Sequence, residues 1–191
     1  MGIQYVSIDM EMTGTNEDIH DVLEFGAVLD EAGSSLPIKQ LPKFHCYFVK
    51  DQYVGAPFAL SMHPKIFRKI ADREQGYKYV SAMKFGHMFK NFLLDHGYKE
   101  SKGRVYINVA GKNFASFDLQ FIKKKTDLLK HVEIRRRIID PSILYLDVAD
   151  EALPGTSLCK KRADLDEQVA HTAIDDAIDV IKLLRYKRFG V

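Results

Sequence analysis

Three early segments of the chain are predicted to be β-strands, and in the first and third of them apolar and polar residues alternate with a period of two. The segments are residues 3–10, Val22 to Asp30, and Lys43 to Lys50. A turn-rich stretch at residues 31–35 separates the second segment from the third. The pattern predicts a hairpin or a three-stranded meander at the start of the fold.

Further along the chain, apolar residues recur mainly three and four positions apart, which is the spacing of a helix face. Helices are predicted at residues 65–73, 81–96, 116–130 and 173–186, and a turn at 154–157 marks a further helix start. Short strands are predicted at 104–110 and 137–140. Strands followed by strand–helix alternation predict an α/β fold, with a mixed sheet flanked by helices.

The composition is that of a globular protein, with 46% apolar and 28% charged residues among 191. This length is well above the size at which one hydrophobic core becomes marginal, so we expect a single domain over residues 1–191. The net charge of +2 only weakly favours a polyanionic partner. Affinity for nucleic acid must therefore come from local basic clusters.

Cysteine usage and the absence of a leader-like pattern favour a cytoplasmic location. Cys46 and Cys159 lack ligand-spaced cysteine partners, and we expect both to be reduced core thiols. Residues 1–6 run directly into the first predicted strand and do not resemble a signal peptide. No apolar run approaches membrane-spanning length, so we expect no membrane partner.

Two carboxylates share one face of the first predicted strand. Side chains two residues apart in a strand point the same way, so Asp9 and Glu11 project together. They lie at the C-terminal end of that strand, where open α/β sheets build their sites. Such a pair is unfavourable unless it is paired or metal-bound. Taken alone, it also fits a solvated strand end.

Asp118 is a further acidic candidate, near the start of the predicted helix at 116–130. An acid in the first turn of a helix is stabilised by the helix dipole, so a structural role is equally open.

The final helix separates three aspartates by direction. Its apolar stripe consists of Ile174, Ala177, Ile178, Ile181 and Leu184. Asp176 flanks this stripe, whereas Asp175 and Asp179 are expected to point further towards solvent. His171 lies before the helix and would approach from the preceding loop. A histidine there is also commonly a cap or a surface residue.

Together these segments supply four carboxylates and one imidazole from distant parts of the sequence. Like charges a few ångströms apart raise one another's pKa, so the four acids can share a site only if a cation neutralises them. Ligand sets made of oxygen atoms suit Mg²⁺ or Mn²⁺. With a histidine added, the set indicates a metal-assisted hydrolase acting on phosphate.

The same segments, in order, resemble the three motifs of the DEDDh branch of 3′–5′ exonucleases, the superfamily of proofreading subunits, RNase T and oligoribonuclease. The matching residues are Asp9, Glu11, Thr13 and Gly14; then Asn113 with Phe117 and Asp118; then His171, Ala173, Asp176 and Ala177. Residues 23–28 and 156–162 match as well. The second motif is one residue longer here than its usual form.

The resemblance implies an RNase H-like fold, with a mixed five-stranded sheet whose second strand is antiparallel. It also implies two divalent metal ions, Mg²⁺ or Mn²⁺. Asp9, Glu11 and Asp176 would hold one ion, and Asp9 would bridge to the second. Asp118 would complete the surroundings of the second ion through water, and His171 would be the general base. The expected reaction releases nucleoside 5′-monophosphates from single-stranded 3′ ends.

Substrate contacts are also implied by the resemblance. The backbone near Met12, Thr13 and Gly14 would touch the terminal nucleotide, with Met12 packing on a sugar or base. Asn113 would lie near the penultimate nucleotide. The basic clusters are residues 123–125, 135–137 and 160–162, and the last is favoured as a phosphate contact because it shortly precedes His171.

An alternative of another class is a non-catalytic RNase H-like module that binds nucleic acid or a protein. The presence of all five candidate site residues argues against it. DNA or RNA as substrate is left open, because different motifs lean towards oligoribonuclease and towards the proofreading type. Action alone, as a homodimer, or with a polymerase or repair partner is likewise open.

Overall fold

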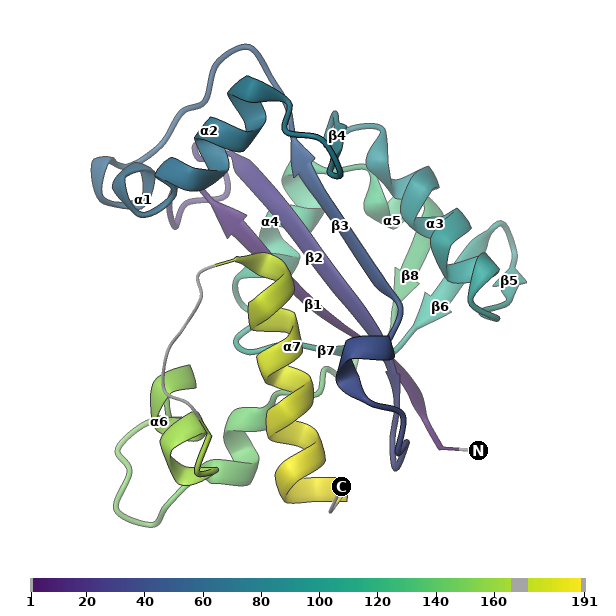
Figure 1. Cartoon of the computed structure of the whole chain (residues 1–191), viewed down its shortest axis with the longest axis vertical. Coiled ribbons are helices and arrows are strands. Elements are labelled where there is room, and N and C mark those ends of the chain that lie inside the picture. Colours follow the sequence, from purple (N-terminus) through teal and green to yellow (C-terminus); the bar gives the residue numbers. More distant parts are fainter. Residues whose placement is uncertain (1, 166–171, 190–191) are drawn as a thin grey trace.

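The computed structural model describes residues 2–165 and 172–189. Its centre is an antiparallel meander of β1 (Gln4–Met12), β2 (Val22–Glu31) and β3 (Lys43–Phe48), shown in Figure 1. These strands closely match the three predicted segments, so the predicted meander is confirmed.

The meander is the middle of a five-stranded sheet with the order β4-β3-β2-β1-β7. β4 (Lys78–Val80) is parallel to β3, and β7 (Val109–Ala110) is parallel to β1. β2 is antiparallel to both of its neighbours, which confirms the mixed sheet with an antiparallel second strand. The strand predicted at 137–140 is reduced to one parallel bridge, between Ala110 and Ile139.

The strand predicted at 104–110 is divided between two sheets. β6 (Arg104–Ile107) pairs with β5 (Glu100–Ser101) and β8 (Val132–Ile134), whereas β7 joins the main sheet. The chain crosses at Asn108, whose carbonyl accepts a hydrogen bond from the N–H of Val6 at 2.9 Å. This change of partner depends on tertiary pairing, which residue alternation does not report.

Helices flank the sheet on both faces. They are α1 (Pro57–Met62), α2 (Pro64–Asp72), α3 (Phe85–Asp95), α4 (Asp118–Lys125), α5 (Leu128–His131), α6 (Thr156–Arg162) and α7 (Ala173–Leu184). Single turns of other helical type lie at Ile38–Gln40, Pro141–Tyr145 and Arg185–Phe189. The helix predicted at 116–130 is wrong as one element. It breaks at Thr126, whose hydroxyl donates to the Ile122 carbonyl and accepts from the N–H of Leu128.

The sheet divides the core into two layers (Figure 1). The larger layer packs the strands against α3, α4 and α5, and the smaller one packs α7 against β1 and β2. Cys46 and Cys159 are both buried and free, as predicted. The arrangement places one acidic face of β1 directly beneath α7.

Candidate metal centre

The alternation of β1 decides which side chains reach the site. Ser7 lies on the α7 side, where its hydroxyl donates to the Ala177 carbonyl at 2.7 Å. Asp9 and Glu11 follow at two-residue spacing and lie on the same side. Met10 and Met12 lie on the opposite side, inside the main core. The prediction that Asp9 and Glu11 share a face is confirmed.

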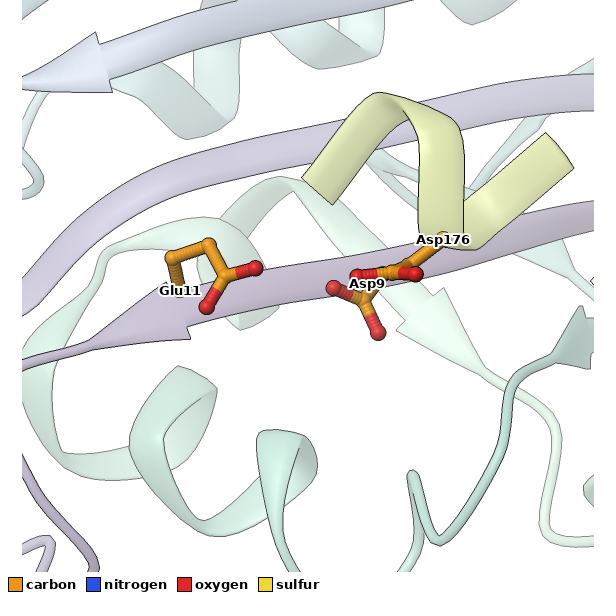
Figure 2. Close-up of side chains that lie close together, drawn as sticks. All are labelled: Asp9, Glu11 and Asp176. Carbon is orange, nitrogen blue, oxygen red and sulfur yellow. The ribbon is translucent and has the colours of Figure 1, made fainter. Parts of the chain in front are cut away.

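Three carboxylates from two elements converge beside α7. Asp9, Glu11 and Asp176 each offer an oxygen, and these oxygens all lie within 4.8 Å of one another. Figure 2 shows Asp176 reaching down from the first turn of α7 towards Asp9, with Glu11 further along β1. The acidic cluster therefore joins β1, near the start of the chain, to α7, near its end.

Asp118 lines the same pocket from the start of α4. The pocket has a volume of about 280 Å³ and is bordered by Asp9, Glu11, Asp118 and Asp176 together with Lys112. The buried carboxylate of Asp118 accepts a hydrogen bond from the N–H of Met10 at 3.1 Å. It is not one of the three residues within ligand distance of one another. Asp118 thus joins the site at its edge.

Crowding of negative charge perturbs the ionisation of the cluster. Burial, reinforced by the charges of Asp118, Asp176 and Glu11, raises the pKa of Asp9 well above its ordinary value. Burial and the neighbouring Asp176 and Glu24 raise the pKa of Glu11 to about 8. Burial also raises the pKa of Asp118 to about 7. The site stores electrostatic repulsion that a bound cation would relieve.

The final helix distributes its aspartates differently from the sequence prediction. Asp175 is exposed and Asp176 is half-buried at the site, as expected. The prediction for Asp179 is wrong, because Asp179 is 5% exposed and pairs with Lys160 of α6 at 2.7 Å. The charged partner from another helix offsets the cost of burying this carboxylate, and Lys182 adds a second contact at 2.8 Å.

Three residues of the basic clusters pair with acids of the same chain. Lys160, in the cluster favoured as a phosphate contact, is 3% exposed and paired with Asp179. Arg162 forms two hydrogen bonds with Asp150. Lys124 pairs with Glu17 and Asp18. The preference for residues 160–162 is therefore not supported at Lys160, whose side chain is withdrawn from solvent.

Three of the predicted substrate-binding residues organise the loops beside the cluster. Thr13 is fully buried, and its hydroxyl accepts from the N–H of Asp21 at 2.7 Å. A side chain at Gly14 would collide with the ring of His20, with a Cβ placed 2.3 Å from its Nδ1. Asn113 is exposed and has a φ of 56°. Contact of the Thr13 and Gly14 backbone with the terminal nucleotide, and the place of Asn113 near the penultimate one, stay predictions.

Met12, the fourth predicted substrate residue, points the other way. Its side chain is 5% exposed and packs in the main core, on the face of β1 opposite Asp9 and Glu11. The expected packing of this side chain against a sugar or base has no support from its position. Only the Met12 backbone lies near the acidic end of the strand.

His171 lies outside the residues that the structure describes, so its predicted role as general base stays a prediction.

Sequence reasoning missed three residues around the cluster. Buried His63 places its Nε2 3.5 Å from a carboxylate oxygen of Glu11. Lys112 lines the pocket and donates to the Ser142 hydroxyl at 2.9 Å. Glu24 is fully buried and lies opposite Glu11 in the β1–β2 register. The signals available for Glu24 are a lone carboxylate within an apolar strand and its place in the family-matching segment 23–28.

The fold has counterparts among solved structures. A product-bound structure of exonuclease I matches with a TM-score of 0.59 and 14% identity, over 98% of this chain and 44% of that one. A second structure of exonuclease I, described as suggesting how processivity is achieved, matches with a TM-score of 0.63 and 14% identity, over 97% and 41%. This chain therefore spans less than half the length of either. The mixed sheet with flanking helices is the RNase H-like fold of these exonucleases.

Other comparisons add no family. No protein-family model and no curated protein matches the chain. Within the part of the chain that the structure describes, no helix is both long and apolar enough to cross a membrane.

Proposed function

We propose that this chain is a metal-dependent 3′–5′ exonuclease that hydrolyses phosphodiester bonds at the ends of single-stranded nucleic acid. The observation that supports the proposal is the convergence of Asp9, Glu11 and Asp176 within 4.8 Å, on a fold shared with exonuclease I. The products would be nucleoside 5′-monophosphates. The fold gives the architecture, and the carboxylates give the chemistry.

The donor set fits a hard divalent cation. Asp9, Glu11 and Asp176 offer carboxylate oxygens, the ligands that Mg²⁺ and Mn²⁺ prefer. The raised pKa of Glu11, near 8, shows how unfavourable this cluster is without a counter-charge. These three residues would hold one ion, and Asp9 with Asp118 would contribute to a second. Bound ions would polarise the phosphate and lower the pKa of a bound water.

Side chains and backbone groups of the chain would orient the metal ligands and the substrate and would deprotonate the attacking water. Met10 fixes the Asp118 carboxylate at the pocket edge through its N–H. His171 would accept the proton of the attacking water, since an ordinary histidine pKa of about 6.5 suits a base near neutral pH. Lys112 is the cationic side chain that lines the pocket among the described residues. It would contact the phosphate of the substrate.

Direction and metal dependence are tested with oligonucleotides labelled at the 5′ end, in Mg²⁺, in Mn²⁺ and in EDTA. A 3′–5′ exonuclease produces a ladder that shortens from the unlabelled end, and a 3′-phosphate block retards it. Asp9→Asn should reduce activity to background. Asp175→Asn is the matched control, because Asp175 is exposed on the same helix turn as Asp176. Full activity of Asp9→Asn would refute the proposal.

Substrate class is resolved by the same assay. Matched DNA and RNA strands, each short and long, should be compared at equal concentration of 3′ ends. A preference for short RNA would place the activity with RNA turnover, and a preference for DNA would place it with repair or proofreading.

The non-catalytic module makes a different prediction. A pure binding module need not take up metal, so calorimetric titration with Mn²⁺ distinguishes the exonuclease from the non-catalytic module. Uptake that is lost in Asp9→Asn but kept in Asp175→Asn supports the enzyme.

A further inference from the structure

Glu24 is a fully buried carboxyl group beside the acidic cluster that is not part of it. It lies on β2 directly across from Glu11 of β1. Burial of such a group is unfavourable unless its oxygens are hydrogen-bonded. One oxygen contacts Nε2 of His45, and the other accepts a hydrogen bond from the N–H of Ala173 at 3.2 Å. Both carboxyl oxygens are therefore occupied.

The bond to Ala173 anchors the helix that carries Asp176. Ala173 is the first residue of α7, and its N–H has no partner within the helix. Thr172 caps the same turn by accepting from the N–H of Asp175. Asp176 follows three residues after Ala173. The position of this turn sets the position of the Asp176 carboxylate.

Gly26 provides a second contact between β2 and the helix start. It is two residues beyond Glu24 on the same strand and therefore on the same face. A Cβ at Gly26 would lie 2.4 Å from the carbonyl carbon of Ala173, so only glycine allows this approach. β2 thus holds the first turn of α7 by close packing at one residue and by a hydrogen bond at another.

We propose that Glu24 is a positioning residue for the metal centre. It fixes the first turn of α7 through the Ala173 amide, and thereby sets Asp176 against Asp9 and Glu11. His45 holds the Glu24 carboxyl group from its other side. The proposal rests on the proposed function in one respect, namely that the acidic cluster binds a divalent ion.

Three variants separate the effect of losing the Glu24–Ala173 hydrogen bond from the effects of losing the Glu24 charge and of lowering overall stability. Glu24→Gln and Glu24→Met both remove the negative charge next to Glu11, but only Gln keeps an acceptor for Ala173. Met occupies similar space, which limits cavity formation. Asp30→Asn is the matched control, because Asp30 is a buried acid on the same face of β2 but pairs with Arg185 and Tyr5, away from the cluster.

Two measurements are made on each variant: amide exchange of Ala173 by NMR without metal, and Mn²⁺ affinity by calorimetry. Glu24→Met should accelerate exchange of the Ala173 amide and weaken Mn²⁺ binding by about 10–100-fold, the usual effect of losing a group that orients a ligand. Glu24→Gln should stay within about 3-fold of wild type, the equivalent of part of one net hydrogen bond. Asp30→Asn should lower the melting temperature without weakening Mn²⁺ binding.

Each outcome decides the matter. Unchanged Ala173 exchange in Glu24→Met would overturn the anchoring bond. Faster exchange with unchanged Mn²⁺ affinity would show that the bond does not position Asp176. Equal weakening in Asp30→Asn would reduce Glu24 to a general stability role. If the wild-type protein takes up no Mn²⁺, the proposed function fails, and the exchange data alone still decide whether Glu24 holds α7.

Discussion

The carboxylate of Asp118 and the backbone N–H of Met10 form a 3.1 Å hydrogen bond between two acidic segments that are distant in sequence. β7 pairs with β1 only as far as Ser7, where it meets Ala110. Beyond that point no strand among the described residues pairs with this edge of β1, and the side chain of Asp118 takes the place of one. Asp118 therefore has a structural role as well as the proposed chemical one.

These two roles can be separated by substitution at Asp118. Asp118→Asn keeps an acceptor for Met10, so its free energy of unfolding should stay within about 1 kcal/mol of wild type. Its nuclease activity should fall by about 10–100-fold, because the second metal position loses a carboxylate. Asp118→Ala should show the same activity loss and an additional loss of about 1–3 kcal/mol in stability, since a buried N–H is left without a partner. Urea unfolding and the 5′-label assay give both values. Wild-type activity in Asp118→Asn would exclude its role in metal binding.

The metal-free protein should lose stability as pH rises. The pKa of Glu11 is raised to about 8 and that of Asp118 to about 7, so the folded state holds protons that the unfolded state releases from about pH 4.5 upward. Stability is therefore present at pH 5 and declines up to about pH 8. Melting curves in EDTA from pH 5 to 8.5 measure the decline.

A substitution identifies the source of this pH dependence. Glu11→Gln should flatten the decline and raise the melting temperature in EDTA at pH 8 by roughly 3–10 °C, the equivalent of about 1–3 kcal/mol. Saturating Mn²⁺ should restore wild-type stability at pH 8 but act less on Glu11→Gln. A flat profile for the wild-type protein in EDTA would contradict the electrostatic account.

Local periodicity was enough to predict the part of the site that lies on single elements. The placement of Asp9 and Glu11 on one face needs only the pleat of a strand, and the choice of Asp176 over Asp175 needs only the helix angle. The three early strands and α2 follow for the same reason. The RNase H-like fold was expected from motif resemblance, and the strand order could not be read from the residues.

The sequence predictions fail where a contact with a distant part of the chain determines the position of a side chain or the pairing of a strand. Asp179 was expected in solvent because Lys160 was not known to face it. The 104–110 strand was expected to be continuous because its change of sheet at Asn108 has no mark in its own alternation. The sequence around Glu24 gives no sign of its role in positioning α7, because its hydrogen-bond partner lies 149 residues away, at Ala173. Contacts of this range become visible only once the chain is folded.

Substitution of Lys112 should weaken substrate binding more than metal binding. Its Nζ is held by the Ser142 hydroxyl at 2.9 Å, on the wall of the acidic pocket. Lys112→Met should raise KM for oligonucleotides by about 10-fold or more, as expected for loss of one charge-assisted hydrogen bond to phosphate. Mn²⁺ affinity should be unchanged or tighter, since a positive charge leaves the pocket.

Calorimetry and steady-state kinetics on the same preparation test the Lys112 prediction. Lys130→Met is the control, because Lys130 is an exposed lysine outside both the pocket and the basic clusters. Weaker Mn²⁺ binding with unchanged KM would show that Lys112 supports the acidic residues and does not contact the substrate.

Lys160 should prove to be a stability residue, although its sequence neighbourhood favoured a phosphate contact. Lys160→Met leaves buried Asp179 paired with the half-exposed Lys182 within the described part of the chain. This change should cost roughly 3 kcal/mol of unfolding free energy. Lys160→Met combined with Asp179→Leu should recover most of that loss, because neither position of the buried pair then carries a charge. Lys161→Met, at the exposed neighbouring position, should change stability by less than about 0.5 kcal/mol.

Urea unfolding measures stability, and titration of a single-stranded oligonucleotide at several salt concentrations measures phosphate contacts. An unchanged salt slope for Lys160→Met is expected, because a side chain 3% exposed does not reach a phosphate; a shallower slope with unchanged stability would restore Lys160 to the nucleic-acid surface.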